Sequence, residues 1–143
     1  MRAVLAALAL LPALPAPAAA ETVGGCDTAS LQGPALTACL TTADQQAGEA
    51  LRTTLQAALD SIRTRAGVFD SQRARWRNSL AESQEMWLRW RNAECQNVAP
   101  YEGQSASSNV MKNRVAAFEA KLACTIRTSE ARREDLAARY PAP

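Results

Sequence analysis

The sequence contains no histidine and carries almost no net charge. Without an imidazole, mechanisms that need a histidine base and metal sites with histidine ligands are excluded. The formal net charge is +2, from 16 basic and 14 acidic residues, which excludes a nucleic-acid-binding tail or an acidic solvating segment. We therefore expect no nucleic-acid partner, no metal and no cofactor.

Internal repeats, low-complexity segments and strand signals are also lacking. There is no Asn-Gly or Asp-Gly turn, and β-branched residues rarely cluster. Beyond the N-terminus, no apolar run approaches the roughly 20 residues that cross a bilayer. A chain of 143 residues has the length of one domain, so we expect one helical domain without a membrane span.

The first 20 residues have the features of a secretory signal peptide. Arg2 precedes an apolar run over residues 3–11, and three alanines precede a cleavage site after Ala20. This run is too short to span a bilayer, and three prolines follow it, which disfavours an uncleaved anchor. The sequence therefore predicts a signal peptide over 1–20, a mature domain over 21–143 and a periplasmic or secreted location.

A lipoprotein is a further alternative, because residues 23–26 loosely resemble a lipobox that would lipidate Cys26. Glu21 and Thr22 separate this cysteine from the apolar run, and lipidation would leave an odd number of cysteines. We therefore expect no lipid anchor at Cys26.

Apolar residues recur at steps of three and four in three segments, which indicates three amphipathic helices. Their predicted bounds are Gly33–Pro34 to Gly67, Asp70 or Ser71 to Pro100, and Ser107 or Ser108 to about Tyr140, with a loop over 99–108. The predicted fold is all-α, an elongated antiparallel three-helix bundle. Such a bundle buries a narrow seam and gains stability from disulfides.

Each predicted helix has one stripe that should face its neighbours. The stripe of the first helix is Leu36, Leu40, Ala43, Ala47, Leu51, Leu55, Ala58 and Ile62. That of the second is Phe69, Trp76, Leu80, Trp87, Glu94 and Val98. That of the third is Met111, Val115, Phe118, Leu122, Ile126 and Ser129.

Four cysteines in an exported chain predict two disulfides. The residues are Cys26, Cys39, Cys95 and Cys124, and their spacings of 13, 56 and 29 residues lack the close pair of a zinc site. Cys39 and Cys95 should lie at the same end of antiparallel helices, which favours pairing 39–95 with 26–124. The sequential pairing, 26–39 with 95–124, is nearly as well supported.

Polar residues interrupt the apolar stripe of the second helix. With Trp87 at the centre of the buried face, Glu94 lies about 20° away, Arg91 about 40° and Gln84 about 60°. Buried charges need partners, so we interpret Arg91 and Glu94 as pairing with each other or with a neighbouring helix. The alternative is a polar ligand pocket. Trp90 lies at the edge of the stripe and should be partly exposed.

These residues resemble the LprI-like lysozyme inhibitor family. The resemblance rests on the cysteines and on a motif Gln-x-x-Trp-x-x-Tyr-Arg-Asp-x-Glu-Cys, here Gln84, Trp87, Trp90, Arg91, Asn92, Glu94 and Cys95. Trp90 replaces a tyrosine and Asn92 an aspartate, and Leu51 is followed by arginine where the family has asparagine. The closing pattern is similar to Cys124, Ser129, Arg132 and Leu136, with serine in place of threonine. The resemblance spans about residues 26–136 and implies a disulfide-bonded helical domain and lysozyme inhibition.

Two functions remain open. The first is a non-enzymatic binding protein that inhibits lysozyme, with partner contacts either at Tyr101 and Glu102 in the 99–108 loop or at Trp90. The simpler interpretation of that loop is a plain connection. The second is a structural or interaction protein of the bacterial cell envelope. Catalysis is not expected, because Glu85, Glu94 and Glu102 are not spaced as a glycosidase carboxylate pair.

Overall fold

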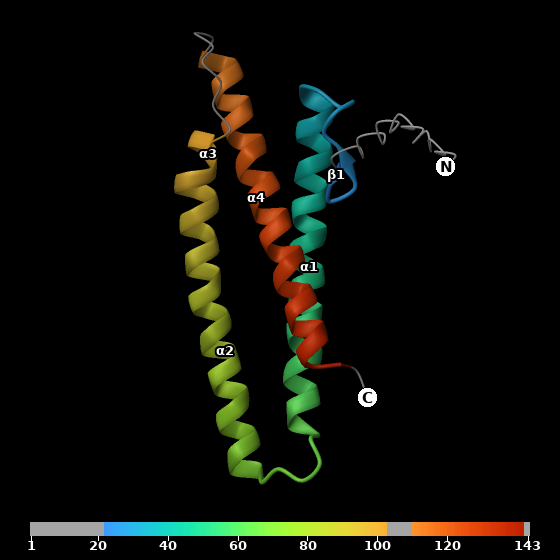
Figure 1. The fold of residues 1–143 in the computed structure, drawn as a ribbon, viewed down its shortest axis with the longest axis vertical. Coiled ribbons are helices and arrows are strands. Elements are labelled where there is room, and N and C mark those ends of the chain that lie inside the picture. The colour runs from blue at the N-terminus through green and yellow to red at the C-terminus, as the bar shows by residue number, and fades with distance from the viewer. Residues whose placement is uncertain (1–21, 103–109, 142–143) are drawn as a thin grey trace, which may run out of the picture.

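The computed structural model describes residues 22–102 and 110–141, with side chains from residue 113 onward in the second range. The predicted signal peptide lies outside these residues. Three long helices dominate the fold: α1 (Pro34–Arg63), α2 (Asp70–Ala93) and α4 (Val110–Arg139). Helices α1 and α4 run in the same direction and α2 runs against them (Figure 1). The prediction of an elongated all-α three-helix bundle with two disulfides is confirmed.

Helix α1 follows its sequence prediction closely. Gly33, just before the helix, adopts a positive φ of 57°. Pro34 suits the first helical position because the N–H that proline lacks would have no intrahelical partner there. Gly67, with φ of 74°, lies in the connection to α2. Six of the eight predicted stripe residues are buried: Leu40, Ala43, Ala47, Leu51, Ala58 and Ile62. Leu36 and Leu55 are half-buried against the same core.

The end of α2 differs from the prediction, because Pro100 does not stop the helix. After Ala93 the chain forms a π-helical turn, η1 (Glu94–Val98), and then a short helix, α3 (Ala99–Glu102). Pro100 therefore lies directly after a π-helical turn within a continuous helical run, and the local change in hydrogen-bond register there accommodates a residue that lacks an N–H. The first residues of the predicted 99–108 loop are thus helical, and residues 103–109 lie outside the described ranges.

The buried face of α2 is also different from the predicted one. Leu80 and Gln84 are buried, Trp87 and Glu94 are half-buried, and Phe69, Trp76 and Val98 are exposed. Helix α4 ends well short of the lower tips of α1 and α2 (Figure 1). The first turns of α2 therefore pack mainly against α1, and Tyr140, just after α4, adds a contact: Trp76 Nε1 donates a 3.3 Å hydrogen bond to its hydroxyl, and the two ring centroids are 6.0 Å apart. The broad apolar face that the sequence predicted is thus only partly covered there.

Helix α4 begins beyond the start of α1. The hydroxyl of Thr37, in the first turn of α1, donates a 2.7 Å hydrogen bond to Glu119 Oε1, so the first turns of α4 lie beyond the start of α1. Val115 and Phe118 are consequently exposed, although both lie on the predicted stripe. Further along the helix, Leu122, Ile126 and Ser129 are buried as predicted. The side chain of Met111 lies outside the described residues.

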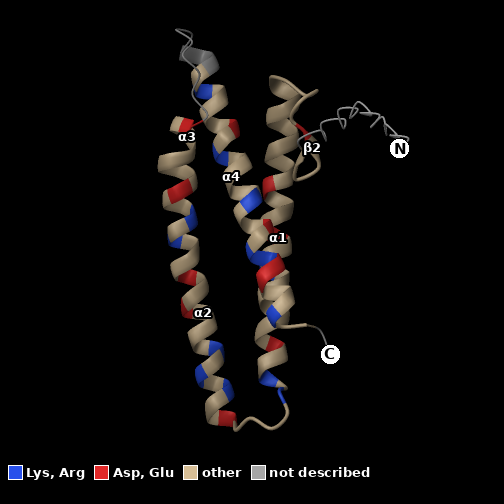
Figure 2. Cartoon of the chain, viewed as in Figure 1, with Lys and Arg blue, Asp and Glu red and all other residues tan. Residues whose placement is uncertain are grey.

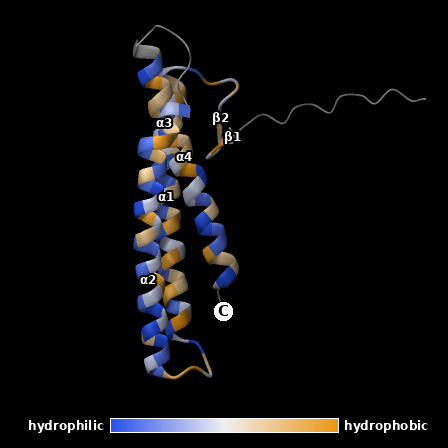
Figure 3. Ribbon diagram, turned by 60° about the vertical axis from the view of Figure 1, so that its left-hand side comes forward, coloured by the Kyte–Doolittle hydropathy of each residue, from blue (hydrophilic) through white to orange (hydrophobic). Residues whose placement is uncertain are grey.

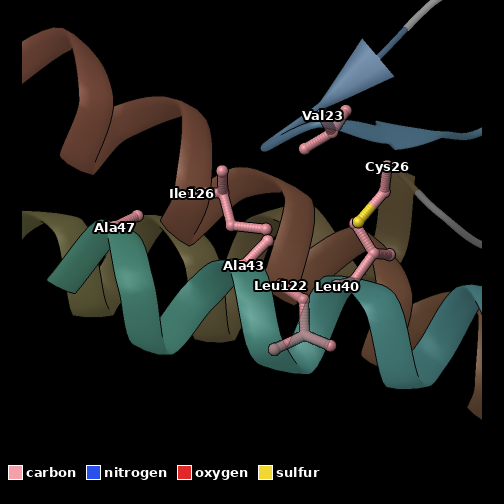
Figure 4. Close-up of a cluster of buried hydrophobic side chains, with 7 residues drawn as sticks. All are labelled: Val23, Cys26, Leu40, Ala43, Ala47, Leu122 and Ile126. Atoms are coloured by element: carbon pink, nitrogen blue, oxygen red, sulfur yellow. The ribbon is translucent and has the colours of Figure 1, made fainter.

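A short hairpin near the N-terminus was not predicted. Strand β1 (Thr22–Val23) pairs antiparallel with β2 (Cys26–Asp27) around Gly24 and Gly25, whose φ values are 57° and 80°. Glycine pairs suit such two-residue turns because both positions require positive φ. Val23 and Cys26 are buried against α1 and α4 (Figure 4).

The core consists of two separate clusters along the bundle. The upper cluster joins the hairpin to α1 and α4 and contains Val23, Cys26, Leu40, Ala43, Ala47, Leu122 and Ile126 (Figure 4). The lower cluster joins all three long helices and contains Leu51, Ala58, Ile62, Leu80 and Leu136. Hydrophobic and hydrophilic residues alternate along each helix (Figure 3), as a narrow seam requires. No helix in the described ranges has the length and apolarity needed to cross a membrane.

The structure contains two disulfides, as predicted, but the favoured pairing of the four cysteines is wrong and the sequential alternative is present. The bonds are Cys26–Cys39, with S–S of 2.05 Å, and Cys95–Cys124, with S–S of 2.01 Å. At the end of the bundle that holds the cysteines, α4 packs against both α1 and the η1–α3 segment. Cys95 of η1 therefore bonds to Cys124 of α4 and not to Cys39 of α1. Cys39 meets the hairpin that covers α1.

Candidate functional site

Most of the motif residues meet where α2 packs against α4. Gln84 is only 4% exposed, and its Oε1 accepts a 3.1 Å hydrogen bond from Nε of Arg132. The same guanidinium donates from Nη1 to Asp135 at 2.8 Å. Leu136, one turn further along α4, is fully buried in the lower core cluster. Gln84, Arg132 and Leu136 therefore act together in joining the two helices.

Trp87 lies between two arginines. The guanidinium carbon of Arg91 is 5.4 Å from the ring centroid, and that of Arg132 is 6.0 Å from it. Both distances fall within the range of cation–π attraction. Arg91 Nε and Arg132 Nη2 are buried without a hydrogen-bond partner among the described residues, so attraction to the indole offsets part of the cost of burying them.

Arg91 pairs with α4 and not with Glu94. Its Nη1 donates a 3.1 Å hydrogen bond to the hydroxyl of Ser129, which is buried. Its Nη2 donates to Asn92 at 3.1 Å. In the described part of the chain no ion pair joins Arg91 to Glu94. The expected pairing with a neighbouring helix is therefore confirmed for Arg91, whereas for Glu94 neither expected pairing is found among the described residues.

Asp44 on α1 faces this polar cluster. Burial raises the pKa of the Asp44 carboxyl, and the charges of Arg91 and Lys121 offset part of that rise. Burial likewise lowers the pKa of the Arg91 guanidinium, against the charge of Asp44. Asp44 and Arg91 line a groove of about 430 Å³ between α1 and α2. The sequence offered no sign of Asp44, because its role depends on where α1 lies against α2.

The other motif residues face a second groove, of about 470 Å³, between the η1–α3 segment and α4. Trp90 is 52% exposed there, as predicted from its place at the edge of the stripe. Glu94, half-buried, and Glu102, exposed, lie on the same wall as Trp90. We call this the Trp90 groove; its lining residues are Trp90, Glu94, Ala99, Glu102, Ala120, Ala123, Cys124, Arg127 and Thr128.

Of the two loop residues proposed as partner contacts, only Glu102 lines the Trp90 groove. Tyr101 is 72% exposed and lies outside its lining. Arg127 belongs to the lining but was missed at the sequence level. The signal for it is the spacing of positions 120, 123, 124, 127 and 128, which places them on one face of α4.

The side chains of the Trp90 groove are of types that could bind a partner by contact and by charge. It combines an indole face, two carboxylates, one guanidinium and several small side chains. Its wall is fixed by the Cys95–Cys124 disulfide, which joins η1 to α4. Within residues 22–102 and 110–141, no three side chains of metal-binding type cluster, and all four cysteines are disulfide-bonded.

Comparison with known proteins gives one match. The model of the family described as "Lysozyme inhibitor LprI" matches residues 26–136, which is most of the chain and includes every motif residue described above. No curated protein and no solved structure matches the chain significantly. From the match over residues 26–136, we conclude that the chain belongs to the lysozyme inhibitor LprI family.

Proposed function

We propose that this protein is exported after loss of residues 1–20 and that it binds and inhibits a lysozyme outside the cytoplasm. The family to which the chain belongs supports lysozyme as the partner. Two disulfides suit an oxidising compartment. Inhibition would be stoichiometric, because the protein would act by occupying a surface of the enzyme and not by chemistry.

The observation that carries this proposal is the Trp90 groove. A half-exposed tryptophan beside a groove is typical of residues that dominate protein–protein binding. The groove also lies on a rigid part of the fold, since the Cys95–Cys124 bond holds its two walls together. A pre-organised surface binds with less loss of conformational freedom.

The remaining motif residues have a separate role in this proposal. Gln84, Trp87, Arg91 and Arg132 join α2 to α4 and are mostly shielded from a partner. They would hold the groove walls at a fixed separation without touching lysozyme. Trp90 and Glu94 would make the contact.

The test is a cell-wall turnover assay with lysozymes of several classes and the oxidised protein. We expect inhibition of at least one class that saturates near one inhibitor per enzyme and weakens when the disulfides are reduced. Trp90→Ala should weaken inhibition at least tenfold, because truncating an interface tryptophan that is a hot spot removes about 2 kcal/mol or more of binding free energy. Tyr101→Ala is the matched control, an exposed aromatic residue outside the groove, and it should leave inhibition unchanged.

Two results would contradict the proposal in different ways. If no lysozyme class is inhibited at micromolar protein, lysozyme inhibition is wrong, and an interaction with another envelope protein takes its place. If inhibition is lost with Tyr101→Ala and kept with Trp90→Ala, the protein inhibits lysozyme through α3 and not through the groove.

A further inference from the structure

We propose that the Trp90 groove binds one cationic side chain, arginine or lysine, that projects from the partner. The cation would lie over the indole of Trp90 with its charge shared between Glu94 and Glu102. This inference deepens the proposed function, on which it rests for the identity of the partner. The chemistry of the groove can also be tested without lysozyme.

Glu94 is available to a ligand in the Trp90 groove. It is half-buried in the groove wall, and within the described ranges its carboxylate makes no hydrogen bond or ion pair. Its oxygens are not among the buried unpaired side-chain atoms, so the carboxylate can be reached from the groove. An accessible carboxylate without a partner in the described ranges is available to a cation from outside the chain.

Trp90, Glu94 and Glu102 line the same groove. Glu94 follows Trp90 by four residues, so one helical turn separates them on the same side of the chain. Glu102 lines the same groove from α3. An aromatic face with carboxylates beside it is the arrangement that holds a guanidinium or an ammonium group, through cation–π attraction and charge-assisted hydrogen bonds.

The described residues of the Trp90 groove carry an excess of negative charge. Among the described residues of the lining, Arg127 is the one with a positive charge, and it already has an interaction of its own. The two carboxylates therefore exceed the positive charge by one. The opposite wall consists largely of small residues, Ala120 and Ala123, which leave room for a long side chain. A volume of about 470 Å³ lies within the range of about 300–1,000 Å³ seen for ligand sites.

Charge complementarity here is local and not global. The chain as a whole has a net charge of +2, and basic and acidic residues are interspersed along the three long helices (Figure 2). A strongly basic animal lysozyme would therefore gain no long-range steering toward this protein. Its arginine and lysine side chains would be recognised only at a site with its own negative charge, and the Trp90 groove provides one.

The first experiment uses a small probe in place of lysozyme. N-acetyl-arginine N-methylamide is titrated into the oxidised protein, with tryptophan fluorescence as the signal, beside the citrulline analogue, which has nearly the same shape and no charge. We expect the arginine probe to change the fluorescence with a millimolar Kd and the citrulline probe to have at least fivefold weaker binding. Trp90→Phe should remove most of the signal. Equal responses to both probes, or none, would overturn the proposal.

The second experiment measures the Kd for a basic animal lysozyme. Glu94→Gln and Glu102→Gln should each weaken binding about five- to tenfold, since each removes one charge-assisted contact. Glu85→Gln, an exposed position on α2 outside the groove, is the matched control and should change nothing. Arg127→Gln should leave binding as tight or tighter, because it removes a charge that repels the cation. Thermal melts of each variant show that the fold is intact.

The outcomes separate the two proposals. Tight lysozyme binding that is indifferent to Glu94→Gln and Glu102→Gln would overturn the cation site and leave lysozyme inhibition standing. Loss of binding with Arg127→Gln would identify an anion site instead. If lysozyme does not bind at all, the proposed function is wrong, and the arginine titration still decides whether the groove binds a cation.

Discussion

The side-chain amide of Gln84 accepts a hydrogen bond from Arg132 at 3.1 Å, and this bond joins α2 to α4 in a buried setting. Gln84→Ala leaves the Arg132 donor buried and unpaired. We expect the free energy of unfolding to fall by about 1–3 kcal/mol. Chemical denaturation measures the change. Gln45→Ala, at an exposed position on α1, is the control and should change stability by less than about 0.5 kcal/mol.

Alanine substitutions at Trp87 and Trp90 should differ in how much they lower the free energy of unfolding, although the two ring centroids lie only 6.5 Å apart. Trp87→Ala removes the half-buried ring between Arg91 and Arg132, and should lower the free energy of unfolding by about 2–4 kcal/mol. Trp90→Ala removes a largely exposed ring and should cost at most about 1 kcal/mol. Denaturant titrations of both variants give the comparison. Equal losses of stability would show that Trp90 is a core residue and not a free contact residue.

Gly24 and Gly25 provide a matched pair in the hairpin. Both have positive φ, so alanine costs about 1–2 kcal/mol at either position. At Gly24, a Cβ would also lie 2.7 Å from the Cβ of Ala43, whereas at Gly25 it would meet open space. Gly24→Ala should therefore be the more destabilising by about 1–3 kcal/mol. Thermal melts that show equal effects would mean that the hairpin does not pack on α1.

The disulfide pairing can be read from a tryptic digest of the unreduced protein. No lysine or arginine lies between Cys26 and Cys39, so their bond stays within one peptide. The Cys95–Cys124 bond should link the peptide 92–112 to the peptide 122–127. A link from the Cys39 peptide to either of these would contradict the structure. Replacing Cys95 and Cys124 together by alanine should cost roughly 3.5 kcal/mol, since the bond closes a 29-residue loop.

Asp44→Asn should stabilise the protein in a pH-dependent way. Burial raises the pKa of Asp44 above its usual value of 3.8, so the folded state favours the protonated form. Well below pH 3.8 the carboxyl is largely neutral in both states, and the variant should match the wild type. As pH rises through the raised pKa, only the wild type acquires the partly buried charge and loses stability. The variant should therefore melt at a higher temperature at pH 7 and at the same temperature at pH 3.

A variant that is less stable than the wild type at pH 7 would reverse this conclusion. It would mean that attraction from Arg91 and Lys121 outweighs the burial of Asp44. The comparison at two pH values separates this result from a general effect of the substitution on packing.

The sequence alone was enough to predict the three long helices and the all-α class of the fold. The stripe of α1 was predicted residue by residue because helical periodicity is a local property, fixed by side chains three and four positions apart. The number of cysteines was enough to predict that two disulfides form. The motif from Gln84 to Cys95 was enough to identify the family. The Gly24–Gly25 hairpin escaped prediction because its strands, Thr22–Val23 and Cys26–Asp27, are two residues long and too short to show the alternation that marks a strand.

The tertiary structure decided everything that depends on how α4 lies against its neighbours. Its offset, visible in the bond between Thr37 and Glu119, exposes Val115 and Phe118 despite their place on the stripe. Its position beside η1 pairs Cys95 with Cys124 and draws Arg91 to Ser129, leaving Glu94 in the groove. Offsets and tilts between helices arise from the packing of whole helix faces against each other. The spacing of residues within one helix therefore does not predict them.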